Sequence, residues 1–251
     1  MSTINEKIEK TVQWLQDKVE ESHSKGLIVG VSGGIDSAVV ANLIKRACPE
    51  NSLGVLLDIQ NSEVDKEDAM KVIEACGIKH MTLNLENSHD VLIDTVVENL
   101  KENDLYREDT HRMTDANLRA RLRMCTIYAI ANNLGYLVAG TDNAAEMYTG
   151  YFTKYGDGGV DILPICNISK AEVYDWARSL GVPESLITKA PTAGLWEGQT
   201  DENEMGTTYD MIDAVMNGRE EEVPEKDRKI IDRLHTNSEH KRNTPGKPPK
   251  F

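Results

Sequence analysis

The segment at 27–37, LIVGVSGGIDS, constrains the fold of this chain more than any other stretch. Leu27 to Val31 are apolar apart from one glycine, which predicts a buried strand of a parallel sheet. The residues Ser32-Gly33-Gly34 are typical of a tight turn. A helix is then expected to begin at Asp36 and to continue to residue 47. A strand, a turn and a helix in this order indicate an α/β protein.

The turn at 32–34 is a natural anion site, because backbone N–H groups and the helix dipole meet there. Glycine also lets the backbone approach a phosphate where a Cβ would collide. The segment is not a Walker loop, since no lysine follows its glycines. We therefore expect Ser-Gly-Gly-x-Asp-Ser to bind the phosphates of a nucleotide. The alternative is an ordinary strand–turn–helix corner that Asp36 caps.

Three further apolar segments, 53–57, 80–85 and 136–139, are predicted strands. The predicted helices cover 4–23, 36–47, 63–76, 88–103, 114–133 and 170–180. This order predicts a doubly wound parallel sheet with helices on both faces. Ligands of such sheets bind at the carboxyl ends of the strands, where the loops after Val31, Leu57 and Ala139 lie. The stretches 150–160 and 192–206 are expected to be irregular loops.

Size and charge limit the function classes. The 251 residues predict a single domain over 1–251 with a mobile C-terminal tail at 238–251. With 28 basic and 42 acidic residues the net charge is −14, which disfavours a nucleic-acid partner. No apolar run reaches the length of a membrane span, and the N-terminus lacks the apolar core of a signal peptide. Four scattered cysteines fit reduced thiols. We expect a cytoplasmic protein without a membrane partner.

A second polar cluster follows the predicted strand at 136–139. Thr141 can bond a nucleotide through its hydroxyl, and Glu146 is expected to face the first loop across the top of the sheet. Mg²⁺ takes oxygen ligands, of which usually only one or two come from the protein. Asp36 and Glu146 would suffice. The alternative is a helix cap and a surface acid.

The predicted helix at 114–133 carries Asn117, Arg121 and Tyr128 at spacings of four and seven residues, so they share one face. Arginine forms bidentate bonds with phosphate or carboxylate, although charges on a helix are usually solvated. In the glycine-rich loop, Lys154 can neutralise a phosphate and Asp161 can accept from a hydroxyl or amine. On its own, a glycine-rich loop of this kind usually indicates only a turn.

The C-terminal region has a basic cluster that includes His240 and Lys241 and precedes Pro245. Two interpretations stay open for it. The cluster either caps an anionic ligand or belongs to a disordered terminus.

These pieces, in this order, resemble the ammonia-dependent NAD synthetases, which are ATP pyrophosphatases. The matching segments span nearly the whole chain: GVSGGIDSAVVA, NLRARLRM, GTDNAAEMYTGYFTKYGDGGVDILPICNISKAEV, KAPTAGLWEGQTDENEMGTTYDMID and EHKR. The resemblance implies a doubly wound, adenine nucleotide alpha-hydrolase-like fold and a homodimer with the active sites near the shared interface.

The resemblance also implies a set of site residues. Asp36 and Glu146 match magnesium ligands. The positions that match ATP contacts are Gly30, Val31, Ser32, Gly33, Gly34, Ile35, Asp36, Ser37, Thr141, Lys170 and Thr192. Those that match deamido-NAD contacts are Arg121, Lys154, Asp161, His240 and Lys241. Lys170 and Thr192 rest on the resemblance alone.

The implied reaction has two steps. The nicotinate carboxylate of deamido-NAD attacks the α-phosphorus of ATP and expels pyrophosphate, and ammonia then converts the acyl adenylate to NAD and AMP. Lys170 and the loop would neutralise the charge on the leaving pyrophosphate. Asp161 is a candidate to orient or deprotonate the incoming ammonium. The sheet consumes the chain and leaves no glutaminase domain, so we expect ammonia as the nitrogen donor; a separate glutaminase partner stays open.

The alternative functions differ from this reaction in the molecule that is modified. Related ATP pyrophosphatases amidate a purine nucleotide or thiolate tRNA. The tRNA enzymes generally use a cysteine pair and a basic face, whereas the cysteines here are scattered and the net charge is −14. The FTKYGDGGVD loop favours the NAD enzyme over the purine enzyme. A non-catalytic nucleotide-binding module would not need both Asp36 and Glu146.

Overall fold

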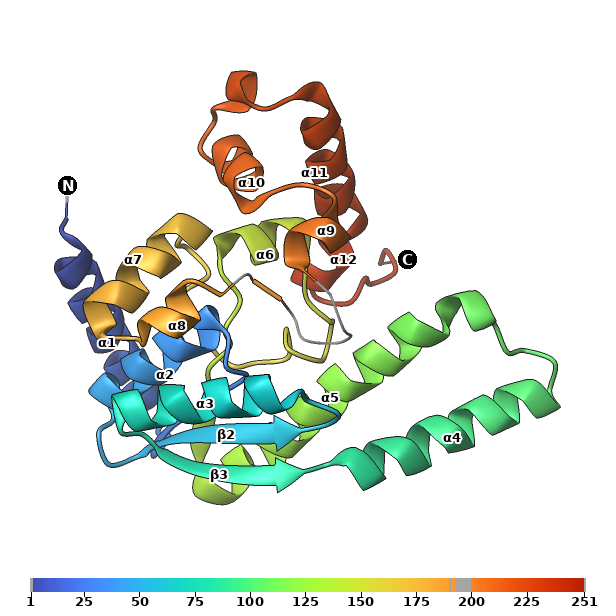
Figure 1. Ribbon diagram of the computed structural model, residues 1–251, viewed down its shortest axis with the longest axis horizontal. Helices are drawn as coiled ribbons and strands as arrows, with labels where there is room; N and C mark the ends of the chain where they lie inside the picture. Colours follow the sequence, from blue (N-terminus) through green and yellow to red (C-terminus); the bar gives the residue numbers. More distant parts are fainter. Residues whose placement is uncertain (1, 190, 193–199, 251) are drawn as a thin grey trace.

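The computed structural model describes residues 2–189, 191–192 and 200–250 (Figure 1). The strands are β1 (Gly26–Gly30), β2 (Ser52–Asp58), β3 (Lys79–Asn84) and β4 (Tyr136–Val138). The helices up to β4 are α1 (Ile4–Glu21), α2 (Ile35–Ala47), α3 (Glu63–Cys76), α4 (Glu86–Glu102) and α5 (Glu108–Leu134). The later helices are α6 (Ala144–Thr149), α7 (Lys170–Leu180), α8 (Glu184–Ile187), α9 (Asp201–Met205), α10 (Tyr209–Met216), the 3₁₀ turn η1 (Glu220–Glu222), α11 (Glu225–Asn237) and α12 (Glu239–Arg242).

The four strands form a parallel sheet in the order β3-β2-β1-β4. The chain runs outward from β1 through β2 to β3 and then returns to the other side of β1 with β4. This reversal opens a crevice at the carboxyl ends of β1 and β4, the usual ligand position in such a sheet. The predicted doubly wound sheet is confirmed, and every predicted strand and helix is present. The largest difference is at α5, which begins at Glu108 and not at the expected residue 114.

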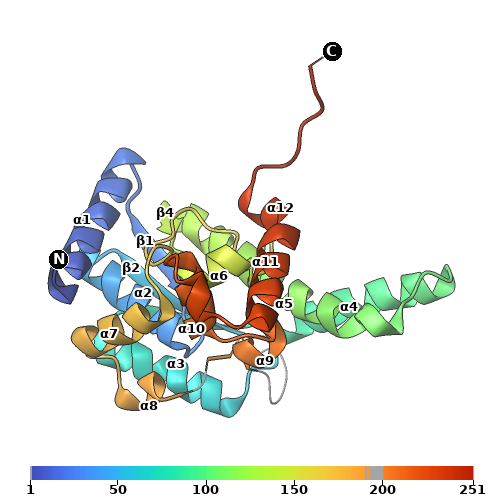
Figure 2. The ribbon, with the colours of Figure 1, turned by 90° about the horizontal axis from the view of Figure 1, so that it is seen from above.

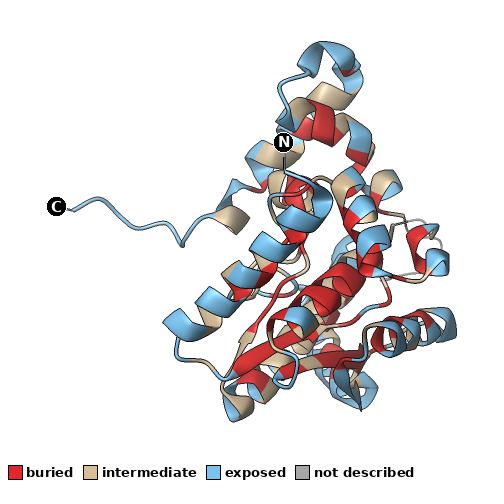
Figure 3. Ribbon diagram, turned by 90° about the vertical axis from the view of Figure 1, so that its left-hand side faces the viewer, coloured by how far each residue is buried: buried red, intermediate tan, exposed pale blue. Residues whose placement is uncertain are grey.

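The two faces of the sheet carry separate apolar clusters. Side chains alternate along β1, so Leu27 and Val29 pack on one face and Ile28 on the other. The first face is covered by α1, α2, α3 and α7, and the second face by α5. Buried residues accordingly concentrate in the sheet and the helices beside it (Figure 3). This packing fixes the positions of the loops that end β1 and β4.

The C-terminal helices form a second layer with its own small core. Side chains of α6, α9, α10 and α11 meet there, among them Ala145, Met205, Tyr209 and Ile231 (Figure 1). The expectation of an irregular stretch at 192–206 is wrong for Asp201–Met205, which is helix α9. The hydroxyl of Thr200 caps this helix and Gly206 ends it in the left-handed conformation. Residues 193–199 lie outside the described residues.

An arm made of α4 and the first half of α5 projects from the body (Figures 1 and 2). Only His89 and Ile93 of α4 are buried. Arg119 and Asp115 of α5 form an ion pair at the base of the arm, and His89 Nε2 lies 2.9 Å from Asp115 Oδ1. Among the described helices, none has both the length and the apolar character needed to cross a membrane.

Candidate active site

The loop between β1 and α2 is closed by its own hydroxyl groups. The Ser37 hydroxyl donates to the Gly34 carbonyl at 2.9 Å, and the Ser32 hydroxyl accepts from the Gly34 N–H at 3.2 Å. Helix α2 begins at Ile35, and its N-cap, Gly34, makes no side-chain cap. Asp36 therefore does not cap α2, unlike in the alternative of an ordinary corner capped by this aspartate. The binding of phosphate by this turn stays a prediction.

Gly33 can be no other residue without a shift of the backbone around it. Its φ of +84° lies in the left-handed region, and a Cβ built there would stand 2.8 Å from the Asp65 carbonyl oxygen and 3.0 Å from Asp68 Cβ. Helix α3 thus packs directly against the loop. The glycine permits both the turn and the close approach of α3.

Asp36 joins three segments that are distant in sequence. Its Oδ2 accepts from Lys170 Nζ at 2.5 Å, and its Oδ1 accepts from Asn143 Nδ2 at 3.0 Å. Lys170 Nζ also lies 3.7 Å from Glu146 Oε1. The loop after β1, the loop after β4 and the first residue of α7 therefore meet at one point. The structure brings together Asp36, Glu146 and Lys170, as the sequence analysis expects.

Two residues of this cluster were missed by the sequence analysis. The Tyr209 hydroxyl donates to Asp201 Oδ2 at 2.9 Å and lies 3.1 Å from Glu146 Oε1. The ring of Tyr209 lies 4.8 Å from Lys170 Nζ, within cation–π range. Tyr151 adds a hydrogen bond to Asp201 at 3.2 Å. Both Asp201 and Tyr209 come from the C-terminal helical layer, where neither periodicity nor spacing points to the sheet.

The cluster is electrostatically crowded. Burial, together with the nearby Asp36 carboxylate, raises the pKa of Glu146 to about 7. Burial and the neighbouring carboxylates also hold the pKa of Asp142 well above its usual range. Burial acts to lower the pKa of Lys170, but Asp36 and Glu146 more than offset it and raise that pKa above its ordinary value. Lys170 is therefore a permanent cation among excess carboxylates.

The donors present fit a hard cation. The carboxylates of Asp36 and Glu146 converge on the same ammonium group, and Asp142 Oδ2 is buried without a hydrogen-bond partner among the described residues. Across the part of the chain that the structure describes, no three or more His, Cys, Asp or Glu side chains form a metal cage. Mg²⁺ normally takes one or two protein carboxylates and completes its shell with phosphate and water. Asp36 and Glu146 supply such a pair.

The polar face of α5 contacts the glycine-rich loop at 150–161. Arg121 Nε donates to the Lys154 carbonyl at 3.3 Å, and Asn117 Oδ1 accepts from the Thr153 hydroxyl at 2.7 Å. The Tyr128 hydroxyl donates to Asp161 Oδ1 at 2.9 Å. The predicted shared face of α5 is confirmed, because all three side chains contact the segment 153–161.

Asp161 uses both carboxylate oxygens within the protein. Oδ1 accepts from Tyr128, and Oδ2 accepts from the Val138 N–H at 2.8 Å. Burial and the hydrogen bond to Asp161 raise the pKa of Tyr128. In this arrangement Asp161 fixes the loop onto the end of β4.

The C-terminal basic cluster is helical and anchored. Lys241 Nζ donates to the carbonyls of Gly150 and Phe152, at 2.8 and 2.6 Å, and the His240 carbonyl accepts from the Lys154 ammonium. Burial lowers the pKa of Lys241. The C-terminal basic cluster and the glycine-rich loop thus lie side by side.

Thr141 and Thr192 occupy the margins of the site. Thr141 is half-buried in the loop after β4, next to the buried Asp142. Thr192 is half-buried and directly precedes residues 193–199, outside the described residues. Their expected contacts with ATP stay predictions.

A turn that requires glycine lies at the switch point of the parallel sheet and faces two carboxylates and a lysine. Open α/β sheets bind their ligands at this edge, so the candidate site lies where the fold class predicts it.

Comparisons with known proteins identify the family. The profile of the NAD synthase family matches residues 7–245. The NH3-dependent NAD⁺ synthetase of Alkaliphilus metalliredigens is 59% identical over 242 residues, which are 96% of this chain and 97% of that protein. The chain belongs to the NAD synthase family, ligases that carry out the final step of NAD biosynthesis.

Two solved structures share the whole fold. An NMN synthetase from Francisella tularensis superposes with a TM-score of 0.89 at 37% identity, with 99% of each chain covered. The NH3-dependent NAD synthetase from Campylobacter jejuni, solved with a nitrate ion, gives a TM-score of 0.81 at 27% identity, with 99% of this chain and 100% of that one covered. These similarities confirm the adenine nucleotide alpha-hydrolase-like fold.

Proposed function

We propose that this chain amidates deamido-NAD with ammonia at the expense of ATP, and that it forms NAD, AMP and pyrophosphate through an acyl adenylate. The convergence of Asp36, Glu146 and Lys170 beside the glycine loop carries the proposal. This cluster offers what adenylation needs: an anion loop, a fixed cation and carboxylates for a metal. Similarity to NH3-dependent NAD⁺ synthetases supports the choice of substrates.

In the first step the nicotinate carboxylate attacks the α-phosphorus, and the bond to the β,γ-pyrophosphate breaks. Backbone N–H groups of the loop at 32–37 bind the phosphates, and Thr141 and Thr192 contribute contacts to ATP. Lys170 moves from Asp36 toward the leaving pyrophosphate, where it neutralises the charge that develops. The protein positions the reactants and supplies no covalent nucleophile.

Mg²⁺ is the proposed metal, held by Asp36 and Glu146. When bound it would neutralise phosphate charge. Tyr209 orients Glu146 through its hydroxyl. The ring of Tyr209 stays close to the Lys170 ammonium while this ammonium moves from Asp36 to the pyrophosphate.

In the second step ammonia attacks the acyl carbon, and the carboxylate oxygen leaves with AMP. Arg121, Lys154, His240 and Lys241 are proposed to bind deamido-NAD, since they border the glycine-rich loop. Asp161 is proposed to orient the incoming ammonium. Full ammonia-dependent turnover of an Asp161→Asn variant would remove that role.

The direct test follows both products in ATP, Mg²⁺ and ammonium, with deamido-NAD present or omitted. The proposal expects pyrophosphate and NAD in equal amounts, and only with deamido-NAD. ATP binding without pyrophosphate release would favour a non-catalytic module instead.

Nicotinate mononucleotide is a second candidate acceptor, because the related Francisella tularensis structure is described as an NMN synthetase. The reaction chemistry would be the same. Parallel measurements of kcat/KM for the two acceptors decide between them, and a higher value for the mononucleotide would change the assignment of the substrate.

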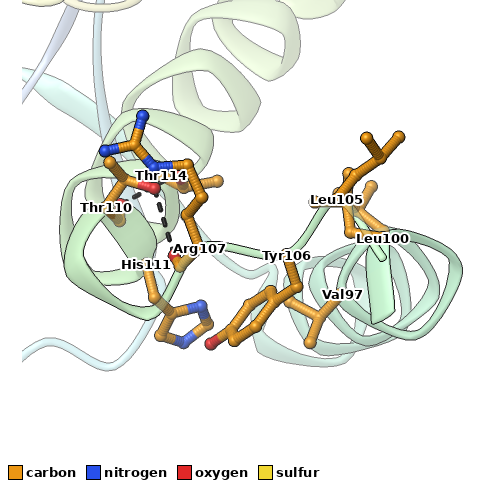
Figure 4. A pocket seen from close by; sticks show the side chains of 9 residues that line it. Val97, Leu100, Leu105, Tyr106, Arg107, Thr110, His111 and Thr114 are labelled. Carbon is orange, nitrogen blue, oxygen red and sulfur yellow. Dashed lines mark hydrogen bonds between the residues drawn. The ribbon is translucent and has the colours of Figure 1, made fainter. Parts of the chain in front are cut away.

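We also propose a homodimer built on the arm. Apolar side chains of the arm are exposed, including Val91 (70% exposed), Leu105 (66%) and Met113 (49%). Between the end of α4 and the start of α5 a cavity of about 100 Å³ is bordered by Leu105, Tyr106 and His111 (Figure 4). A second copy would cover this apolar surface.

Analytical ultracentrifugation tests the dimer. A Val91→Asp variant should shift the protein toward monomer, while Val64→Asp, a change of a similarly exposed valine on α3 (60% against 70%), should leave the dimer intact. A monomeric unmodified protein at micromolar concentration would contradict the proposal. A cytoplasmic location is proposed as well, supported by the four free cysteines.

A further inference from the structure

One arginine side chain of α12 connects the ends of two other helices. The last carbonyl groups of a helix have no donor within the helix, and they carry its negative partial charge. Arg242 Nη1 donates to the carbonyls of Tyr148, at 3.1 Å, and Met147, at 3.4 Å, in the last turn of α6. Arg242 Nη2 donates to the carbonyl of His235, at 2.5 Å, in the last turn of α11. A single guanidinium group therefore links α6, α11 and α12.

The contact between these helices is close-packed. Gly150 ends α6 with a φ of +66°, and a Cβ built there would stand 2.1 Å from Ser238 Cβ. Ser238 follows α11 and is buried, and its hydroxyl accepts from Arg242 Nη1 at 2.7 Å. The ring of Tyr148 stacks on that of His235, with 4.2 Å between the centroids. Arg242 thus completes a junction that has little room for rearrangement.

Helix α12 depends on this junction for its position. It has only four residues, too few for a helix to persist on its own hydrogen bonds. Residues 243–250, which follow it, are all exposed and lead away from the body (Figure 2). Side-chain bonds of Lys241 and Arg242 hold α12 against the body. The Lys154 ammonium adds a bond to the His240 carbonyl.

We propose that Arg242 is a positioning residue for deamido-NAD: it holds α12 on the ends of α6 and α11 and so keeps His240 and Lys241 beside the glycine-rich loop. The proposal rests on the proposed function, in which His240 and Lys241 bind this substrate. Two of the anchoring groups, Lys154 and Lys241, then exchange a backbone carbonyl for the substrate. Arg242 keeps its carbonyl partners on α6 and α11, so it is the anchor that remains during the reaction.

The end of α6 that carries Glu146 is fixed separately. The Asn143 N–H donates to Glu146 Oε2 at 3.0 Å, and Asn143 Oδ1 accepts from the Glu146 N–H at 3.1 Å. The Tyr209 hydroxyl lies 3.1 Å from the other carboxylate oxygen, Glu146 Oε1. Loss of the Arg242 guanidinium should therefore weaken the binding of deamido-NAD and leave the binding of ATP in place.

Arg242→Lys tests the proposal, because it keeps the positive charge but loses the planar fork that reaches carbonyls of two helices at once. Arg242→Gln removes the charge as well. Arg233→Gln is the matched control, since it removes an exposed arginine from α11. The quantities measured for each protein are KM for deamido-NAD, KM for ATP, kcat of NAD formation, and hydrogen–deuterium exchange of the amides at 238–241.

We expect both Arg242 variants to raise KM for deamido-NAD about tenfold or more, the usual cost of losing hydrogen bonds to a charged group. KM for ATP should change little. Exchange at 238–241 should become faster, while the rest of the chain keeps its protection. Arg233→Gln should match the unmodified protein in every measurement.

Gly150→Ala disturbs the same junction from the side of α6, because its methyl group would collide with Ser238. This variant should raise KM for deamido-NAD in the same way. Gly181→Ala, at a φ of +80° with open space around it, is its control and should leave that KM unchanged.

Equal KM for deamido-NAD in Arg242→Lys and Arg233→Gln would overturn the proposal, because the charge alone would then suffice. An equal rise in both KM values would also overturn it, because Arg242 would then only stabilise the fold. Unchanged exchange at 238–241 in the Arg242 variants would contradict the anchoring of α12. If the unmodified protein released no pyrophosphate with deamido-NAD while the exchange contrast persisted, the proposed function would fail and the anchoring of α12 would stand.

Discussion

The sheet body and the C-terminal helical layer hold the same cluster, Asp36, Glu146 and Lys170, in different ways. The body positions Asp36 by backbone geometry: a buried strand, a glycine with positive φ and a helix that begins at once. The helical layer instead reaches the cluster through the polar side chains Asp201 and Tyr209. The positioning by the body depends on residues that are adjacent in sequence. The positioning by the helical layer depends on tertiary packing around a separate small core.

This difference explains what each region can contribute. Under the proposed function, backbone N–H groups in the body bind the phosphates of ATP. Side chains from the helical layer orient the charged groups that act on these phosphates. The predictions below disturb one mode at a time.

Lys170→Met breaks the junction between the two regions and should have the largest effect. Pyrophosphate release should fall by about 10²–10³-fold, the usual cost of removing a group that stabilises developing charge. The variant should also have a lower Tm, because Asp36 and Glu146 remain buried without their cation. Added Mg²⁺ should raise the Tm of the variant more than that of the unmodified protein.

Lys7→Met is the control for that experiment, since Lys7 pairs with Glu172 of the same helix but lies outside the cluster. It should leave turnover nearly unchanged. Turnover of Lys170→Met within tenfold of the unmodified protein would contradict the assigned role.

Gly33→Ala disturbs the body alone. A methyl group at φ +84° would stand 2.8 Å from the Asp65 carbonyl oxygen, so the loop must shift. We expect at least tenfold weaker ATP binding by calorimetry, together with roughly 1–2 kcal/mol of lost stability from the left-handed conformation. Gly77→Ala at φ +64°, with open space around it, should lose stability but bind ATP normally. Equal ATP affinity in the two variants would refute the account of the loop.

Tyr209→Phe disturbs the helical layer alone. It removes the hydroxyl bonded to both Glu146 and Asp201, a loss of about 1 kcal/mol or roughly fivefold in kcat. Tyr151→Phe removes a hydroxyl bonded to Asp201 and Glu204 and should affect kcat less. A larger loss in Tyr151→Phe than in Tyr209→Phe would contradict the importance of the bond to Glu146, which only Tyr209 of these two residues makes.

The smallest expected effect is a pH dependence of stability. Burial raises the pKa of Asp213 from 3.8 to about 6, so the folded protein binds this proton more tightly than the unfolded chain. The stability that this group contributes is therefore present at low pH and is lost as the pH rises through about 6. Since Asn does not titrate, the Tm of Asp213→Asn minus that of the unmodified protein should be higher at pH 8 than at pH 4.5. The reverse order would contradict the raised pKa.

The strands and the anion loop could be predicted from sequence because their signals are local. The apolar run at 27–31, the glycines after it and the carboxyl-end rule place Asp36 and Glu146 at one crevice. The shared face of α5 likewise follows from helical spacing alone.

The helical layer could not be predicted in the same way. Helix α9 has a Thr cap and a Gly stop, a signal that was present but was not used. For Tyr209 no comparable signal exists, because an amphipathic helix does not reveal which other element its polar residues will meet. Tertiary packing decides that, and it brings Tyr209 to Glu146.

The most direct test of the central claim follows an oxygen atom. Deamido-NAD labelled with ¹⁸O at both oxygens of its nicotinate carboxylate is converted with ATP, Mg²⁺ and ammonium. The masses of the products are then measured by mass spectrometry. Adenylation predicts one ¹⁸O atom in each AMP and none in pyrophosphate, because the carboxylate oxygen leaves bound to the α-phosphorus. Unlabelled AMP would contradict the account and show that the amide forms without adenylation of the carboxylate.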